Sequence, residues 1–156
     1  MRATWTRYDI PGWGVGEVGV ADGRLVEHVL PREAAPGAGA AGGDAPLVAR
    51  LEAYFGGARV DFSDVELFPF DATRFERDVL AAARRIPWGE TVSYGELAAL
   101  AGHPRAARAV GSFCARNPFA LVVPCHRVVS SAGPGSYGSL GLEYKLRLLR
   151  LEGVRV

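Results

Sequence analysis

The chain has 156 residues, of which 49% are hydrophobic and 22% charged, and its formal net charge is +1. This length accommodates one large or two small domains with a real core, as in an ordinary folded soluble protein. No run approaches the ~18 to 20 apolar residues of a membrane-spanning helix, and the N-terminus lacks the apolar stretch of a signal peptide. We therefore expect a cytoplasmic protein with no membrane partner.

A small α+β domain is predicted for residues 1–70. Two short β-type runs, Gly14–Val20 and Leu25–Leu30, flank Ala21-Asp22-Gly23, and this turn signal predicts a hairpin. Residues 31–46 are too rich in Gly, Ala and Pro for one structure, so we expect a flexible loop there. A short amphipathic helix over Pro46–Phe55 and a further strand over Ala58–Glu66 complete the predicted domain.

A mainly helical second domain is predicted for residues 71–156. Thr73 with Glu76 forms a capping box that opens a helix running to about Ile86. Ser93 with Glu96 forms another, which opens a short helix ending before a glycine. These two boxes give the clearest element boundaries in the sequence.

The segment PRAARAVGSFCAR, residues 104–116, predicts a third helix joined to the second by a tight turn. It carries Arg105, Arg108 and Arg116, and two short helices joined in this way have the outline of a helix-turn-helix. Many helical hairpins bind no nucleic acid, so the outline alone leaves both interpretations open.

Charge is divided unevenly along the chain. Residues 101–156 hold eight basic residues and two acidic ones, whereas residues 1–100 hold ten basic and fifteen acidic ones. This asymmetry favours a polyanionic partner for the C-terminal part. A basic face without a partner is the alternative.

After the third helix the chain reaches its most unusual stretch, VVPCHRVVS. Asn117 precedes a proline and ends the helix, because a residue before proline is pushed away from helical geometry. Residues 119–123 then predict a buried strand, whose end would expose the thiol of Cys125. A last amphipathic helix over residues 142–153 ends at a glycine.

Two cysteines, Cys114 and Cys125, lie 11 positions apart. We expect both to be free thiols, and we expect no metal, because there is no CxxC or HxxxH spacing. Asn117 and Lys145 are the single asparagine and the single lysine of a chain that has no glutamine. A residue type that survives in one copy is expected to have a role its substitutes cannot fill.

The run IPWGETVSYGELAALAGHPRAARAVGSFCARNPFALVVPCHRVV, followed by GLEYKLRLLRLEG, resembles the O6-alkylguanine-DNA alkyltransferases. The resemblance covers roughly residues 71–153, and its PCHRV signature is highly specific at these spacings. It implies a ribonuclease-H-like N-terminal α/β domain and a C-terminal domain with a helix-turn-helix. It also implies a monomer that binds duplex DNA, flips out a damaged guanine and moves its O6-alkyl group irreversibly onto Cys125, without a cofactor.

The resemblance also implies roles for individual residues. A cysteine with a pKa near ~8.5 needs a base, and the family gives this role to His126, oriented by Glu152. Asn117 braces the turn that carries the cysteine. The implied substrate contacts come from Tyr94, Arg108, Val128, Ser139 and Lys145. The implied DNA contacts come from Arg105, Ala107, Arg108 and Arg116, and Arg108 would fill the space left by the flipped base.

Each assignment has a simpler alternative. The cysteines can be inert packing thiols, which is the interpretation we keep for Cys114. His126 can cap a turn, Tyr94 can pack at a helix start, and Arg108 and Glu152 can be surface residues. At the level of the whole protein, a non-catalytic binder of damaged DNA and a cysteine hydrolase with a turnover cycle are the competing classes.

One segment, SYGSLG, departs from the family pattern. Tyr137 lies twelve positions after the cysteine, where the family has thirteen, and Leu140 occupies a position that is often glycine. A bulky side chain there would narrow the substrate pocket. The sequence therefore predicts better repair of methyl adducts than of benzyl adducts.

Overall fold

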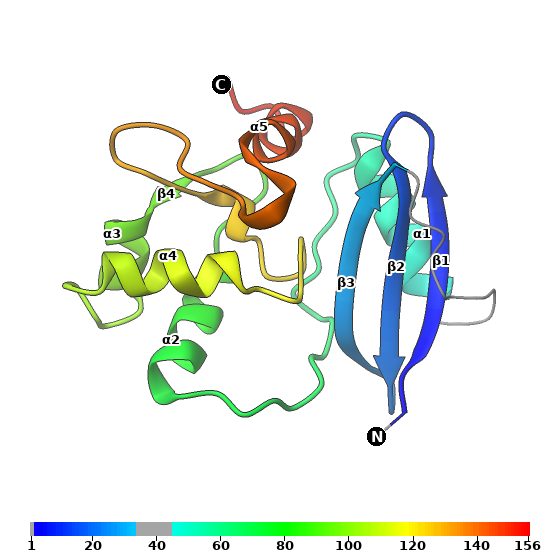
Figure 1. Ribbon diagram of the computed structural model, residues 1–156, viewed down its shortest axis with the longest axis horizontal. Coiled ribbons are helices and arrows are strands. Elements are labelled where there is room, and N and C mark those ends of the chain that lie inside the picture. Colours follow the sequence, from blue (N-terminus) through cyan, green and yellow to red (C-terminus); the bar gives the residue numbers. More distant parts are fainter. Residues whose placement is uncertain (1, 34–44) are drawn as a thin grey trace. The chain divides into compact units, whose positions relative to one another are not determined.

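The computed structural model describes residues 2–33 and 45–156, which form two compact units (Figure 1). The first unit contains the described residues up to Phe70 together with Pro118–Ala120. The second contains Asp71–Asn117 and Leu121–Val156. The prediction of a mixed α/β fold with a mainly helical C-terminal part is confirmed. Among the described residues, none of the helices has the length and apolar character that crossing a membrane requires.

The first unit is built on an antiparallel sheet in the order β1-β2-β3, from strands Thr4–Ile10, Gly14–Ala21 and Arg24–Arg32. The predicted hairpin is present, and its turn places Asp22 and Gly23 at positive φ, as a tight hairpin turn requires. Strand β1 was not predicted. Helix α1, Ala45–Phe55, packs on one face of the sheet (Figure 1) and buries Leu51 and Tyr54 in the core.

Two predictions for this unit need correction. The strand expected over Ala58–Glu66 is wrong, because Asp61 accepts the Ser63 backbone N–H at 2.8 Å and turns the chain, leaving a single bridge from Leu67 to Leu25. The flexible loop expected over residues 31–46 falls mostly on residues 34–44, outside the described residues. Its first two positions belong to β3 and its last two to α1.

The second unit contains α2 (Arg74–Ala83), α3 (Tyr94–Leu100), α4 (Ala107–Ala115) and α5 (Leu142–Leu151). Both capping boxes are confirmed: Thr73 and Ser93 each accept the backbone N–H of the glutamate three residues on, and each glutamate side chain accepts in return. Helix α2 ends at Ala83, short of the predicted Ile86, and continues as single turns into the segment before Pro87.

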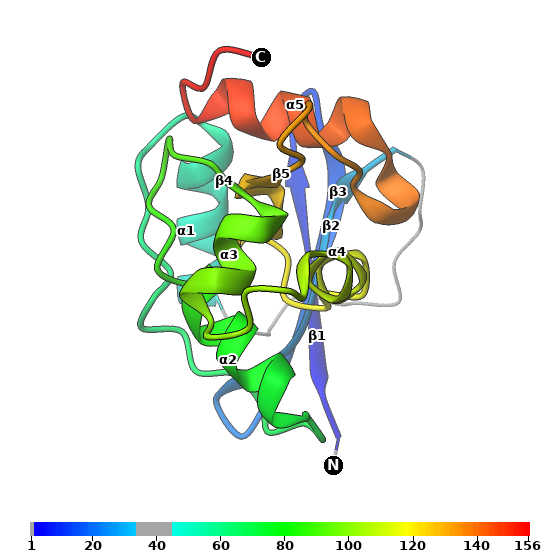
Figure 2. The same ribbon diagram turned by 90° about the vertical axis from the view of Figure 1, so that its left-hand side faces the viewer.

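Helices α3 and α4 are adjacent and joined by a short turn (Figure 2). Gly102 ends α3 at a φ of 84°, a conformation that glycine adopts without a steric penalty. The His103 backbone N–H then bonds to the Ala98 carbonyl at 2.8 Å, and the Ala106 N–H bonds to the His103 carbonyl at 3.0 Å. The predicted helix-turn-helix outline is therefore present.

The strand predicted over residues 119–123 is wrong. Leu121 has a φ of 69°, which breaks an extended run, and Phe119 makes only an isolated bridge with His28. The strand of this region begins later, at β5 (Val128–Val129), which pairs in parallel with β4 (Val92–Ser93). Cys125–Arg127, just before β5, form a 3-10 helix, η1, and Gly138–Leu140, after β5, form another, η2.

Candidate functional site

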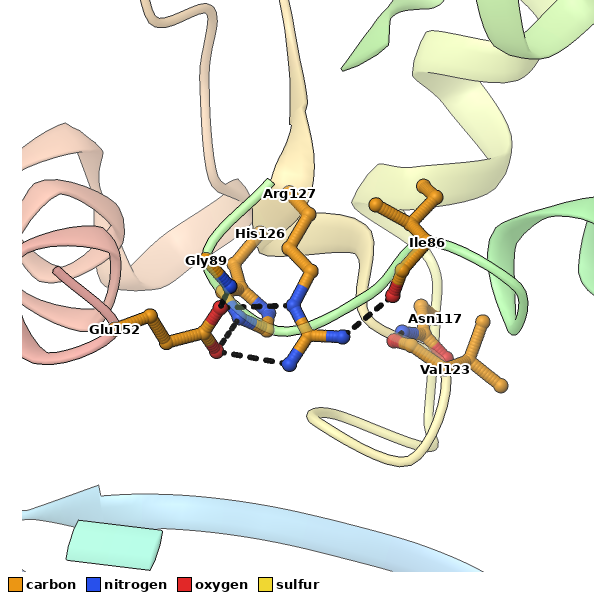
Figure 3. Close-up of polar contacts among 7 residues, drawn as sticks. All are labelled: Ile86, Gly89, Asn117, Val123, His126, Arg127 and Glu152. Carbon is orange, nitrogen blue, oxygen red and sulfur yellow. Dashed lines mark hydrogen bonds and ion pairs between the residues drawn. The ribbon is translucent and has the colours of Figure 1, made fainter. Parts of the chain in front are cut away.

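Cys125 is buried at the first position of η1, with 3% of its surface exposed. The expectation of a thiol exposed at a strand end is therefore wrong. The turn ahead of it is closed at the carbonyl oxygen of Val123, which accepts the Cys125 backbone N–H and the Asn117 side-chain amide, both at 2.8 Å. The structure thus places the single asparagine as a brace of this turn (Figure 3).

His126 and Glu152 are both fully buried, and Nε2 of His126 lies 2.7 Å from Oε2 of Glu152 (Figure 3). Helix α5 brings the carboxylate to this position, since Glu152 is its C-terminal cap. A negative charge at a helix C-terminus opposes the helix dipole, so other partners must hold it there. Nδ1 of His126 is buried and has no hydrogen-bond partner among the described residues.

Arg127 supplies the missing partner and is the site residue that sequence reasoning overlooked. Its Nε donates to Oε1 of Glu152 at 2.8 Å and its Nη2 donates to Oε2 at 3.0 Å. Nη1 donates to the Ile86 carbonyl at 2.7 Å, and the Gly89 backbone N–H donates to Oε1 of Glu152 at 3.2 Å (Figure 3). An arginine inside a β-branched apolar run was the available signal, because a buried guanidinium requires an acid.

This hydrogen-bond network determines the charge states of Glu152 and His126. Burial alone would raise the pKa of Glu152, but the hydrogen bonds and positive charge of its neighbours outweigh it and hold the pKa well below its usual range. Burial lowers the pKa of His126, Glu152 opposes this, and the charges of Arg127 and Lys145 lower it further. The resting site therefore holds a carboxylate beside a neutral imidazole.

The thiol of Cys125 interacts with the thiol of Cys114 on α4, and both cysteines are free. This contact and burial raise the pKa of Cys125 well above its ordinary value, while Asn117 and Lys145 act in the opposite direction. The resting thiol is therefore protonated, and a nucleophilic role requires a base. Cys114, interpreted from sequence as a packing residue, is a direct neighbour of the candidate nucleophile.

Lys145 is fully buried, and its Nζ donates to the carbonyl oxygens of Val128 at 2.5 Å and Ser136 at 3.1 Å and to the Tyr94 hydroxyl at 3.5 Å. The ammonium also lies 5.5 Å from the centre of the Tyr94 ring. Burial lowers the pKa of Lys145 to about 8, against the raising effect of the two cysteines. Three of the residues predicted to bind substrate, Tyr94, Val128 and Lys145, are thus one hydrogen-bonded cluster.

The segment after the cysteine lies against this cluster. A Cβ atom at Gly135 would come 2.6 Å from the Tyr94 hydroxyl and 3.2 Å from Nζ of Lys145, so the close approach requires glycine. Tyr137 has its ring 6.4 Å from that of Tyr144, and burial raises its pKa well above the ordinary value. Ser139 is exposed on η2 and Leu140 is half-buried, so the structure does not bring Ser139 into the cluster.

The arginines predicted to contact DNA lie on or beside α4. Arg105, Arg108 and Arg116 are all exposed, and Ala107 is half-buried at the first position of the helix. Val110 and Phe113 of the same helix are buried. Helix α4 therefore has an apolar inner side, with one exposed arginine on the helix and one beyond each of its ends. Among the described residues no group of three acidic, histidine or cysteine side chains has a geometry that could hold a metal ion.

Comparison with known proteins gives consistent matches. The family model described as 6-O-methylguanine DNA methyltransferase, DNA binding domain, matches residues 74–154. A methylated-DNA--protein-cysteine methyltransferase of Methanosarcina acetivorans is 48% identical over 104 residues, which cover 67% of this chain and 65% of that protein. The protein of the same name from Mycobacterium leprae is 48% identical over 112 residues, covering 71% and 66%. The match thus spans slightly less than two thirds of these relatives.

Solved structures match over nearly the whole chain. The crystal structure of Mycobacterium tuberculosis O6-methylguanine methyltransferase has a TM-score of 0.82 at 35% identity, covering 96% of this chain and 92% of that one. A structure of the Mycobacterium tuberculosis protein in complex with DNA has the same TM-score at 37% identity, over the same shares of both chains. The resemblance stated from the sequence is confirmed.

Proposed function

Because the chain belongs to the O6-methylguanine DNA methyltransferase family, we propose that it repairs DNA by direct reversal of O6-alkylguanine. The alkyl group moves irreversibly to Cys125, so each molecule acts once. The observation that carries the proposal is the buried thiol of Cys125 in a braced turn, next to the 2.7 Å contact between His126 and Glu152.

In the proposed reaction His126 removes the proton of the Cys125 thiol. Nδ1 takes up this proton, relayed by a water molecule, because Nε2 is engaged with Glu152. The thiolate sulfur attacks the alkyl carbon, so that an S–C bond forms as the C–O bond to guanine breaks. The pKa of Cys125 in the resting protein lies well above neutrality, which is why the thiol depends on this base.

The departing guanine needs a proton or hydrogen bonds as charge develops on it. In this proposal Tyr94 donates toward N3 and Ser139 toward O6 of the base. Lys145 donates to the Tyr94 hydroxyl, which helps that phenol to release its proton. The Val128 carbonyl already accepts from Lys145, but a carbonyl oxygen has two lone pairs and can also accept from the guanine amino group.

DNA binding is assigned to the α3–α4 helix pair, with α4 in a groove of duplex DNA. The exposed arginines Arg105, Arg108 and Arg116 contact the nucleic acid, as does Ala107 at the helix start. Arg108 takes the place of the flipped base, and flipping costs a few kcal/mol, less for a weakly paired lesion. Because Cys125 and the helix pair belong to one chain, a monomer is sufficient for the proposed repair.

We also assign the protein to the cytoplasm, where free thiols persist.

The test is a stoichiometry measurement by mass spectrometry with a duplex oligonucleotide carrying O6-methylguanine. We expect one methyl group on the peptide that contains Cys125 and no second turnover. Cys125→Ser should gain none, whereas the matched variant Cys114→Ser should still gain one. DNA binding without a mass change would instead support a non-catalytic damage binder, and repeated turnover a hydrolase.

A further inference from the structure

Arg127 donates two hydrogen bonds to Glu152 in a fork, and it takes no direct part in the proposed reaction. It donates to both carboxylate oxygens, at 2.8 and 3.0 Å, and it is 7% exposed. The Gly89 N–H and His126 supply the remaining two contacts, so each oxygen of Glu152 has two donors (Figure 3). All the hydrogen-bonding capacity that a carboxylate commonly uses is thus occupied.

This arrangement decides which atom holds the proton between His126 and Glu152. In one state Glu152 is ionised and Nε2 of His126 carries the hydrogen, which leaves Nδ1 as an acceptor. In the other state Glu152 is protonated and donates to Nε2, and Nδ1 carries the hydrogen. The second state would leave the buried guanidinium of Arg127 opposite a neutral acid, which is costly in a site that excludes water. Arg127 therefore selects the first state.

The guanidinium is itself fixed from a third direction. Nη1 donates to the Ile86 carbonyl at 2.7 Å, in the segment that connects α2 to β4. Lysine at this position would keep the charge but would lose the planar fork, because a guanidinium can donate to both oxygens and to a carbonyl at once. The position requires arginine for its geometry as well as its charge.

We propose that Arg127 is a positioning residue for the alkyl transfer, which holds Glu152 ionised and thereby keeps Nδ1 of His126 unprotonated and ready to accept the thiol proton. This inference rests on the proposed function, because it assumes that His126 is the base for Cys125. The charged groups acting on His126 are Glu152 and Lys145 from α5 and Arg127 from η1. Removal of Arg127 therefore takes away one of the two positive charges that keep the imidazole neutral.

The test measures the rate of methyl transfer from an O6-methylguanine duplex as a function of pH in the wild type, Arg127→Met, Arg127→Lys and the exposed control Arg150→Met. We expect Arg127→Met to lose at least about tenfold in rate at neutral pH, as when the orienting acid of a triad is removed. The acid limb of its pH–rate profile, where the transfer rate falls as the pH falls, should move to higher pH. Arg127→Lys should be slow with an unmoved limb, and Arg150→Met should match the wild type.

A merely structural role would lower the amount of folded protein without moving the limb. An Arg127→Met protein with the wild-type rate and the wild-type acid limb would overturn the inference, while a wild type that gains no methyl group would overturn the proposed function itself.

A second measurement on the wild type covers the case in which Arg127→Met does not fold. Nitrogen NMR shifts of the three histidines should show His126 with hydrogen on Nε2 alone at pH 7, and hydrogen on Nδ1 would overturn the inference.

Discussion

The side-chain amide of Asn117 donates a 2.8 Å hydrogen bond to the Val123 carbonyl, the same oxygen that accepts the backbone N–H of Cys125. One asparagine thus closes an excursion of the chain whose two ends, Asn117 and Val123, lie six positions apart. Within this excursion Leu121 adopts a positive φ, so the local backbone does not hold the turn by regular pairing. The position of the thiol therefore depends on a side chain.

Asn117→Ala should weaken both folding and alkyl transfer. We expect a loss of about 0.5–1.5 kcal/mol in the free energy of unfolding, because one hydrogen bond is lost while the Val123 carbonyl keeps the Cys125 N–H. The transfer rate of the remaining folded protein should fall as well. Urea unfolding and single-turnover rates measure the two effects, with the exposed Thr91→Ala as control. A normal rate in a destabilised Asn117→Ala would limit the asparagine to a stability role.

His28 predicts a loss of stability in acid. It is buried in the first unit, with Nδ1 donating to the Ala120 carbonyl at 2.6 Å and Nε2 accepting from the Tyr8 hydroxyl at 2.5 Å. Burial lowers its pKa to about 4, and the bond to Ala120 opposes this. Since the folded pKa lies below the unfolded value, the protein should keep this contribution above pH ~6.5 and lose it, on the order of 3 kcal/mol, as pH falls toward 4.

Unfolding free energies at pH 7.5 and pH 4.5 test this, in the wild type and in His28→Gln. The variant should lose less between the two pH values than the wild type, because it has no imidazole to protonate at this position. The same substitution at His103 is the matched control, since His103 is half-buried beside Asp78. Equal pH dependence in the wild type and His28→Gln would contradict the prediction.

Arg108→Ala should lower alkyl transfer from duplex DNA without changing stability. The side chain is exposed on α4, so its removal leaves the core intact, and surface changes of this kind are usually within about ±0.5 kcal/mol. The expected rate loss arises because the variant has no arginine to fill the space that the flipped base leaves in the duplex. Transfer from a single-stranded oligonucleotide should fall less, and equal losses on both substrates would refute a role in base extrusion.

Leu140→Ala should admit larger adducts. If Leu140 narrows the substrate pocket, a smaller side chain should raise the transfer rate for O6-benzylguanine relative to O6-methylguanine. Leu142→Ala is the control, because it removes the same side chain from an exposed position two residues further on. Comparable wild-type rates for the two adducts would contradict this prediction. An unchanged ratio of benzyl to methyl transfer rates in Leu140→Ala would also contradict it.

Features that depend on local chemistry could be predicted from the amino-acid sequence. The two capping boxes, the hairpin turn at Asp22 and Gly23 and the helix pair were all predictable, because their hydrogen bonds join residues within a few positions of one another. The PCHRV motif identified the family. The expected contact between His126 and Glu152 came from that resemblance and not from spacing, since 26 positions separate them.

The remaining features depend on contacts between segments that are far apart in the sequence. The strands predicted over Ala58–Glu66 and residues 119–123 failed because a side-chain turn at Asp61 and a positive φ at Leu121 override β-type composition. The contact between Cys114 and Cys125 and the fork of Arg127 over Glu152 join elements that no periodicity relates. Buried charges find their partners through the packing of distant segments, so their pairing is settled only when the chain has folded.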